Sequence, residues 1–359
     1  MRQDRGDPSE DEVRMLREKA RHIRLETIRL IEIAKVGHYS SVFSCAEIFA
    51  ALYYDVMRLR PGEPAWPDRD RFLMGKGHAA VGLFPVLADH GFIPHELLDG
   101  YTRLGSPLGD HPDMTKVPGV DFSSGSIGHA LSNGAGMALG GRMSQRDFNV
   151  FVMLGDGEMQ EGQVWEAALF AAHHKLSRLV AVIDRNGYQL DGKVDDVIGV
   201  ESLRDKWQAF GWEVHEVDGH DLVALTALLR RLRADEARAR PACVIARTIK
   251  GKGVSYMETE PGWHLGYLAP QDADVYKRQV YTGASYADDA NTLKVPGWTR
   301  FDAGLRYMMD VDGHVVTLRA RVENIANRNY WSSVGGYPGN GYLVLGGPRT
   351  FSLSASMDF

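Results

Sequence analysis

The feature that most constrains the fold is a series of four short, nearly continuous apolar runs separated by stretches with helical spacing. The runs occupy residues 148–154, 179–183, 214–217 and 243–246, and helical patterns lie between them at 163–174 and 222–237. Strands that are apolar on both faces are typical of a parallel sheet covered by helices on each side. The alternation therefore predicts an α/β fold with a doubly wound, mostly parallel sheet.

Two helices are expected before the first of these runs. Ser9 and Glu12 have the spacing of a capping box, and they precede apolar residues that recur at helical intervals. Ser44 and Glu47 repeat that spacing ahead of a second apolar stretch. We therefore expect one helix to begin after Ser9 and a second to begin at Ser44.

Composition excludes several classes of protein. The chain has 359 residues, 44% of them hydrophobic, which is enough for a packed core and for roughly two domains. A net charge of −6 argues against nucleic-acid binding. Cys45 and Cys243 are too few for a disulfide framework and fit buried thiols in a reducing compartment. The charged start lacks the apolar segment of a signal peptide, so we expect a cytoplasmic protein.

The strongest chemical signal joins two of the apolar runs. Gly155, Asp156 and Gly157 follow the run at 148–154, and Asn186 follows the run at 179–183. Neighbouring parallel strands would bring both segments to the carboxyl edge of the sheet, where α/β folds bind ligands. Flanking glycines let the backbone approach a diphosphate, and a carboxylate, an amide oxygen and a backbone carbonyl suit Mg²⁺ or Ca²⁺. A tight turn with a capping aspartate is the alternative, but Asn186 at the matching position favours the cation and diphosphate.

These residues belong to a longer segment that resembles a known motif. Residues 155–192 read GDGEMQEGQVWEAALFAAHHKLSRLVAVIDRNGYQLDG, which resembles the thiamine-diphosphate motif of transketolases, in the form found in N-terminal subunits of split bacterial and archaeal enzymes. Further matching segments occur in the same order, namely VGHYSSVFSCAEI, DRFLMGKGHAA, GDHPD, SSGSIGHALSNGAGMA, IKGKGVSYME and the pair WH at 263–264. The resemblance covers about residues 10–270. It implies ketol transfer between sugar phosphates.

The resemblance also implies a role for individual residues. Asp156 and Asn186 would ligate the divalent cation, together with the Tyr188 carbonyl. The residues implied to contact the cofactor are His78, Gly125, Ile127, Gly155, Asp156, Gly157 and Asn186. The histidines implied to act in or near the substrate channel are His38, His78, His111 and His264. Glu161 resembles the glutamate that links paired active sites across a subunit interface. Imidazoles suit such a channel because they exchange protons near neutral pH.

The family also implies a partner. A complete thiamine-diphosphate enzyme needs a pyrimidine-binding domain, whose glutamate activates the cofactor, and no such segment follows residue 270. The resemblance therefore implies that the partner is a C-terminal transketolase subunit, within a heterotetramer, and that this chain has little activity by itself. Two other enzymes of the same cofactor class remain open: the alpha-type subunit of a 2-oxo acid dehydrogenase, and a deoxyxylulose-phosphate synthase. The four channel histidines favour sugar phosphates.

The remaining histidines and two lysines carry weaker signals. Ordinary surface or core positions are predicted for His22, His90, His95, His173, His174, His215 and His220. His129 either contributes to the site or packs at the start of the glycine- and alanine-rich helix. Lys250 and Lys252 lie between glycines and either neutralise a phosphate or are ordinary loop lysines.

The composition changes near residue 275. Residues 281–359 contain 11 aromatic residues and a single histidine, and their apolar residues alternate with polar ones near 299–307, 316–323 and 351–359. Period-two alternation predicts β-strands that have one apolar and one polar face, either in a half-buried antiparallel sheet or in an outer-membrane protein. We therefore expect a short antiparallel β tail after the α/β part.

The tail resembles a different family. GWTRFDAGLRY, VTLRARVENIANRNYW and GGPRTFSLSASMDF, which ends on Phe359, resemble the C-terminal strands of a TonB-dependent outer-membrane receptor. This resemblance implies a chimera with a cofactor-binding part at 1–272, a join at 273–280 and the tail at 281–359. The join lacks the glycine, serine and proline of evolved linkers. The alternatives are a genuine fusion whose tail forms a small sheet, and a non-enzymatic transport protein.

Overall fold

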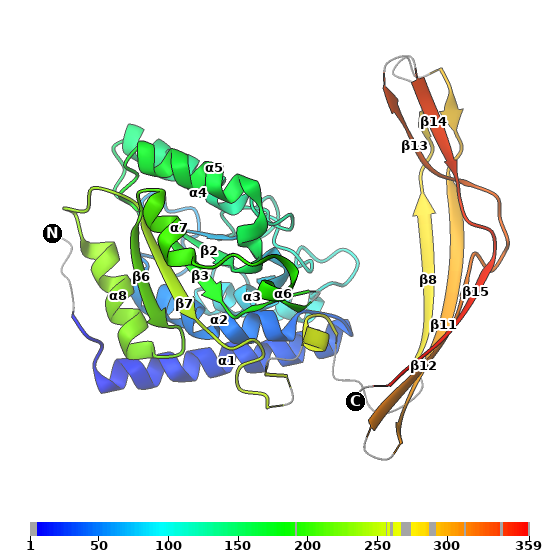
Figure 1. The fold of residues 1–359 in the computed structure, drawn as a ribbon, viewed down its shortest axis with the longest axis horizontal. Helices are drawn as coiled ribbons and strands as arrows, with labels where there is room; N and C mark the ends of the chain where they lie inside the picture. Colours follow the sequence, from blue (N-terminus) through cyan, green and yellow to red (C-terminus); the bar gives the residue numbers. More distant parts are fainter. Residues whose placement is uncertain are drawn as a thin grey trace. The chain divides into compact units, whose positions relative to one another are not determined.

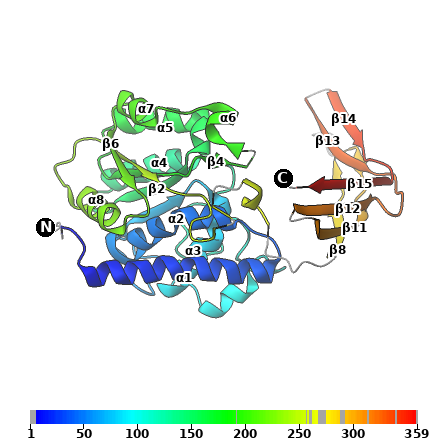
Figure 2. The same cartoon turned by 60° about the horizontal axis from the view of Figure 1, so that its bottom comes forward.

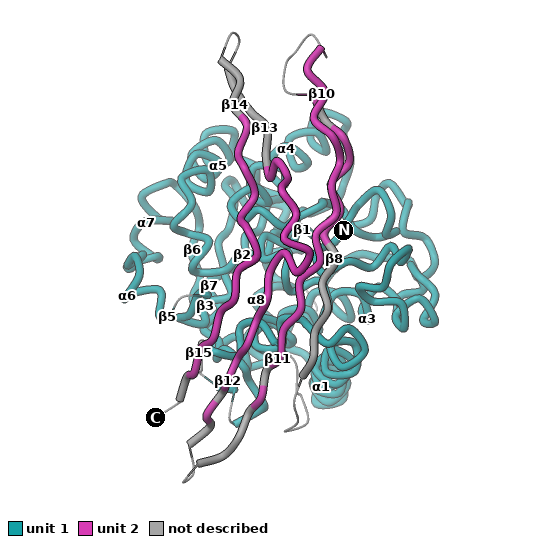
Figure 3. Tube along the Cα trace, turned by 90° about the vertical axis from the view of Figure 1, so that its right-hand side faces the viewer, with its two compact units in different colours: residues 1–268 teal, residues 269–359 magenta. Residues whose placement is uncertain are grey.

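The computed structural model describes residues 6–190, 192–255, 257–258, 261–266, 274–286, 292–311, 314–337 and 340–357. The chain divides into two compact units, Met1–Leu268 and Ala269–Phe359, which Figure 3 colours separately. Within the described ranges, no helix combines the length and hydropathy that crossing a lipid bilayer would require.

The first unit is built on a five-stranded parallel sheet with the order β1-β2-β3-β7-β6 (Figure 1). Its strands are β1 (Arg71–Met74), β2 (Val150–Gly155), β3 (Leu179–Arg185), β6 (Glu213–Asp218) and β7 (Ala242–Arg247). Four of them coincide with the apolar runs of the sequence, so the predicted α/β class with a parallel sheet is confirmed. β1 is the strand that the apolar runs did not predict.

Helices cover both faces of this sheet and enclose a hydrophobic core on each side (Figure 2). One core contains α1 (Glu10–Ala34), α2 (Tyr39–Ala51), α3 (Ala80–Asp89) and α8 (Leu222–Ala234). The other contains α4 (Ala130–Met143), α5 (Gly162–His173) and α7 (Leu203–Ala209). Phe151 and Met153 of β2 enter the first core, whereas Val152 enters the second. The strands are apolar on both faces because both faces are buried.

Shorter elements connect these layers. A π-helical turn (Leu52–Val56) extends α2, and α6 (Val194–Ile198) follows the two-residue strands β4 (Tyr188–Gln189) and β5 (Gly192–Lys193). The 3-10 turns are Gly77–Ala79, His95–Gly100, Gly157–Gln160 and Pro261–Trp263.

One of the two predicted capping boxes is confirmed and the other is wrong. The Glu12 N–H donates to Ser9 Oγ at 3.3 Å, and the Ser9 N–H donates to Glu12 Oε2 at 2.8 Å, which caps α1. Ser44 lies inside α2, and its hydroxyl donates to Asp184 at 2.6 Å. Glu47 forms an ion pair with an arginine of α1. The spacing misled because both side chains serve buried tertiary contacts.

The second unit contains an antiparallel sheet with the order β15-β12-β11-β8. Its strands are β8 (Asp274–Thr282), β11 (Trp298–Val311), β12 (His314–Glu323) and β15 (Thr350–Met357). Two strand pairs complete the unit, β9 (Ser285–Tyr286) with β10 (Lys294–Val295) and β13 (Trp331–Tyr337) with β14 (Asn340–Leu345). The predicted antiparallel β tail is confirmed.

Two expectations for the tail fall at the limits of the described residues. Residue 273 of the predicted join lies outside them, whereas residues 274–280 belong to β8, which pairs with β11. The terminal Phe359 also lies outside the described residues.

Candidate functional site

The carboxyl ends of β2 and β3 lie side by side, with Gly155 paired to Asp184. Asp156 follows β2 and is buried; its Oδ1 accepts the Gly157 N–H at 2.9 Å, and its Oδ2 accepts the Gly187 N–H at 2.6 Å. Gly187 has φ +79°, a conformation that suits glycine and turns its N–H toward Asp156. The segment that carries Asn186 is thereby fastened to the segment that carries Asp156.

A pocket of about 250 Å³ opens at this edge of the sheet. The sequence-predicted residues that line it are His78, Ile127, Gly155, Asp156, Gly157, Glu161, Asn186, Tyr188 and His264. Six further residues line it that sequence reasoning did not select, namely Ser41, Lys76, Glu158, Gln160, Gln189 and Leu190.

Three of the predicted histidines form a cluster beside the pocket. The ring centroid of His38 lies 4.9 Å from that of His78 and 5.3 Å from that of His264, and the last two are 5.1 Å apart. The fourth, His111, lies next to the predicted Gly125, because a Cβ at Gly125 would be 3.4 Å from the His111 ring. The structure thus brings segments that are far apart in sequence to one place.

Burial and nearby lysines keep two of these imidazoles neutral. Burial, followed by the charge of Lys250, lowers the pKa of His264 to about 3. Burial and then the charge of Lys76 hold the pKa of His78 well below its ordinary value. Lys250 Nζ lies 3.1 Å from His264 Nδ1, and Ser41 Oγ lies 3.1 Å from His78 Nε2. Both rings therefore accept or donate hydrogen bonds here as neutral groups.

A buried ion pair supports the floor of the pocket. Lys76 donates to the Ser41 carbonyl at 2.8 Å and pairs with Asp184, whose side chain is fully buried. Asp184 also accepts a hydrogen bond from Thr248 at 2.5 Å. Burial would lower the pKa of Lys76, but Asp184 outweighs burial and raises it. The signals for this pair were a lysine inside the GKGH segment and an aspartate inside an apolar strand.

Glu158 joins two of the loops that line the pocket. Its carboxylate accepts the Gly128 N–H at 2.7 Å and the Gly155 N–H at 3.1 Å. Burial raises its pKa to about 7. The loop that carries Gly125 and Ile127 is thus tied to the end of β2. Sequence reasoning passed over Glu158 because it reads as one more acidic residue in a turn.

The donor set at Asp156 suits a hard divalent cation. Burial raises the pKa of the Asp156 carboxyl to about 6, which shows that its negative charge lacks full compensation inside the protein. The Asn186 side-chain N–H group faces Asp184 and Ser44, each at 3.3 Å, so its amide has a defined orientation. Among the described residues no cluster of three or more His, Cys, Asp or Glu gathers elsewhere as a metal site. Carboxylate, amide and carbonyl oxygens are the ligands that Mg²⁺ and Ca²⁺ prefer.

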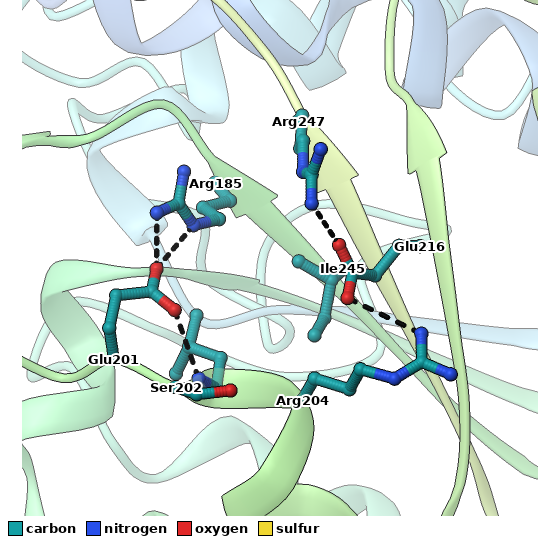
Figure 4. A pocket seen from close by; sticks show the side chains of 8 residues that line it. Arg185, Glu201, Ser202, Arg204, Glu216, Ile245 and Arg247 are labelled. Carbon is teal, nitrogen blue, oxygen red and sulfur yellow. Dashed lines mark hydrogen bonds and ion pairs between the residues drawn. The ribbon is translucent and has the colours of Figure 1, made fainter.

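A second pocket, of about 330 Å³, lies beyond the ends of β3, β6 and β7 and is satisfied by its own ion pairs. Arg185 pairs with Glu201, and Glu216 lies between Arg204 and Arg247 (Figure 4). Because these charges are paired with one another, the pocket has no evident demand for a bound anion.

The comparison with protein families decides the identity of the first unit. The family model described as "Transketolase, thiamine diphosphate binding domain" matches residues 16–288. The chain belongs to the transketolase family. A transketolase of this family is a transferase, and the matched domain is the one that binds thiamine diphosphate. The match ends at residue 288, so most of the second unit lies outside it.

Relatives of two sizes match the transketolase part. One of the two subunits of an apulose-4-phosphate transketolase from Phocaeicola vulgatus is 41% identical over 70% of this chain and 90% of the relative. The 6-deoxy-6-sulfo-D-fructose transketolase subunit SqwG of Clostridium sp. is 39% identical over 69% of this chain and 90% of the relative. The mouse transketolase is 34% identical, but only 43% of its length is covered.

Solved transketolase structures show the same fold. The Pichia stipitis enzyme in complex with sedoheptulose 7-phosphate superposes with a TM-score of 0.67 at 28% identity, over 71% of this chain and 39% of that chain. The Campylobacter jejuni enzyme superposes with a TM-score of 0.66 at 26% identity, over 70% and 40%. The chain therefore spans less than half the length of these single-chain transketolases.

Proposed function

We propose that this chain is the cofactor-binding subunit of a two-subunit transketolase, which transfers a two-carbon ketol unit between sugar phosphates. The observation that carries this proposal is the pocket at the ends of β2 and β3. There, buried oxygen ligands, glycine-lined backbone and two buried lysines lie beside a cluster of histidines. Such a pocket offers a place for a cation, a diphosphate and a sugar side by side.

Asp156, Asn186 and the Tyr188 carbonyl would hold Mg²⁺, which in turn would bind the diphosphate of the cofactor. Gly155 and Gly157 would let the backbone approach the diphosphate closely. Lys250 lines this region through its hydrogen bond to the Gln189 carbonyl at 3.3 Å, and its charge would help to neutralise phosphate oxygens.

The histidines would handle the sugar. When bound, thiamine diphosphate supplies the carbanion equivalent that ketol transfer requires. His38, His78, His111 and His264 would hydrogen-bond to the hydroxyl and carbonyl groups of the sugar and would move protons during the reaction. Gly125 and Ile127 would contact the cofactor rings.

A second polypeptide would complete the active site. The relatives that are themselves named as transketolase subunits support this, because 90% of their length is covered by the present chain. Glu161 is the N-cap of α5 and is exposed, so it is available to a neighbouring protomer. We propose a C-terminal transketolase subunit that carries the pyrimidine domain, assembly into a heterotetramer, and a cytoplasmic location in sugar-phosphate metabolism such as the pentose phosphate pathway.

The test is reconstitution with such a partner. The full chain, mixed with the C-terminal subunit, thiamine diphosphate and Mg²⁺, is expected to transfer a ketol unit from xylulose 5-phosphate to an aldose phosphate acceptor. Neither polypeptide is expected to give turnover without the other. Decarboxylation of pyruvate by the same mixture, without ketol transfer, would assign the chain to a 2-oxo acid or deoxyxylulose-phosphate enzyme instead.

We further propose that residues 281–359 are foreign to the transketolase part and derive from strands like those of a TonB-dependent outer-membrane receptor, joined within 273–280 after a domain at 1–272. The alternating apolar pattern and the exposed apolar residues Phe351 and Leu353 support this. Sequencing the source DNA through codons 265–285 tests the join. An early stop codon followed by a pyrimidine-domain gene is expected, whereas an uninterrupted frame to the last codon would mean that the fusion is real.

A further inference from the structure

Asp110 lies between two of the candidate channel histidines. Its Oδ1 is 3.5 Å from His38 Nδ1, and its Oδ2 is 3.8 Å from His111 Nδ1. The hydroxyl of Tyr101 donates a hydrogen bond to the same Oδ1 at 3.0 Å. Tyr101 is fully buried and packs against Phe84, with ring centroids 6.1 Å apart. The carboxylate is therefore held from behind by a residue that is itself fixed in the core.

His38 has an incomplete hydrogen-bonding pattern that Asp110 can complete. The His38 residue is 8% exposed, and its buried Nδ1 has no hydrogen-bond partner within the described part of the chain. The Asp110 carboxylate faces this atom at 3.5 Å, which is an ion-pair distance that a small shift would convert into a hydrogen bond. A buried ring nitrogen beside a carboxylate is favoured as an N–H donor, because a lone pair there would face a negative charge.

The charges around the cluster distinguish His38 from its neighbours. His78 lies beside Lys76 and His264 lies beside Lys250, and both lysines oppose a positive charge on the ring. His38 faces a carboxylate. Burial would raise the pKa of Asp110, but the His38 and Tyr101 interactions outweigh burial and hold that pKa below its ordinary value, so Asp110 is ionised.

We propose that Asp110, anchored by Tyr101, is a positioning residue that fixes the proton of His38 on Nδ1. Nε2 is then the atom of His38 that accepts a hydrogen bond. The role of that acceptor toward a hydroxyl of the sugar phosphate rests on the proposed function, whereas the tautomer itself does not. Asp110 acts through His38 in the same way that outer carboxylates orient the histidines of many enzyme sites.

The decisive measurement is the tautomer of His38 in the full chain. Two-bond ¹H–¹⁵N correlation spectra of ¹⁵N-histidine-labelled protein distinguish Nδ1–H from Nε2–H, and the signals of His38 are identified by their loss in His38→Gln. We expect the Nδ1–H form in the unmodified chain and loss of this preference in Asp110→Asn. Tyr101→Phe keeps the ring packing and is expected to give a smaller change in the same direction.

Asp113→Asn is the matched control, because Asp113 lies in the same segment and hydrogen-bonds to Thr115, not to a histidine. It should leave the His38 signals unchanged. An Nε2–H form in the unmodified chain, or the same tautomer in Asp110→Asn as in the unmodified chain, would overturn the proposal. Changes of equal size in Asp113→Asn would also overturn it, because they would indicate a general disturbance of the loop.

The reconstituted enzyme gives a second readout. Asp110→Asn is expected to lower kcat about 10-fold with little change in KM, since a misplaced proton impairs the reaction more than substrate binding. If the unmodified complex transfers no ketol unit, the proposed function fails while the NMR spectra still decide the role of Asp110. If transfer occurs and kcat is unaffected by Asp110→Asn, the positioning role fails while the function stands.

Discussion

The two sheets of this chain use the same kind of residue in opposite surroundings. In the parallel sheet, Phe151 and Val182 are fully buried between helices. In the antiparallel sheet, Leu353 is 85% exposed and Phe351 is 71% exposed, although both belong to its apolar face. Periodicity predicts strands in both cases. Only the first sheet has helices that complete a core on each side, so burial depends on the layers around a strand and not on the strand's own pattern.

The buried acids of the two units differ in the same way. Asp302 of the antiparallel sheet is paired with Arg300 at 2.8 Å, and it accepts the Asn324 N–H at 2.9 Å. Asp156 of the parallel sheet accepts two backbone N–H groups, yet burial still raises its pKa to about 6. An acid that is fully compensated serves the fold. One that is not fully compensated is suited to a cation that arrives from outside.

The largest effect should come from the core of the parallel sheet. Phe151→Ala leaves a cavity where the ring is fully buried, so we expect it to lower the free energy of unfolding by about 3–5 kcal/mol. Leu353→Ala removes an exposed side chain and should change this free energy by less than about 0.5 kcal/mol. Urea denaturation followed by circular dichroism measures both. Equal losses in the two variants would contradict the contrast between the sheets.

The next effect concerns the uncompensated acid. Asp156→Ala removes a proposed Mg²⁺ ligand while deleting little core volume, so the affinity for thiamine diphosphate in the presence of Mg²⁺ should fall about 100-fold or more. Thermal shift with and without the cofactor, together with circular dichroism, measures binding and folding separately. Asp195→Ala, at an exposed position of α6, serves as the control. Retained cofactor affinity in a folded Asp156→Ala protein would exclude Asp156 as a ligand.

Much of this architecture follows from local sequence alone. The apolar runs at 148–154 and 179–183 predict β2 and β3, and the Ser9 and Glu12 spacing predicts the start of α1. These succeed because their causes are local: strand burial, helix period and a cap. The start of α2 was mispredicted because Ser44 and Glu47 have partners 140 and 23 residues away, Asp184 and an arginine of α1 respectively.

The candidate site divides along the same line. Motif reasoning selects residues whose side chains face a ligand, such as Asp156 and Asn186. It passes over Lys76 and Asp184, which face one another inside the protein, and over Asp110, which faces His38. Such supporting pairs depend on which segments the fold brings together. No spacing within a single segment reports that.

A smaller effect should appear as a dependence on pH. Burial, and then the charge of Lys76, lowers the pKa of Lys250 to about 8, so its ammonium is charged at pH 7 and mostly neutral at pH 9. If that charge assists diphosphate binding, cofactor affinity should fall about 10-fold between these values, as the protonated fraction does. His264, with a pKa of about 3, stays neutral throughout and adds nothing to the slope. Lys250→Arg should bind independently of pH in this range. A slope that persists in this variant would assign it to another group.

The smallest effect should come from the largest deletion. Both cores of the first unit are formed by its own residues, up to Met257, among the side chains that the structure describes. Removing residues 269–359 should therefore leave the thermal midpoint of the remaining unit within about 1–2 °C, since a change of 1 kcal/mol moves such a midpoint by only about 2–4 °C. Cofactor affinity should be unchanged, and the shortened protein should aggregate less, because the exposed apolar face of the tail is gone. A clear fall in the midpoint or in cofactor affinity would show that the tail supports the transketolase part, and it would favour a genuine fusion over an accidental join.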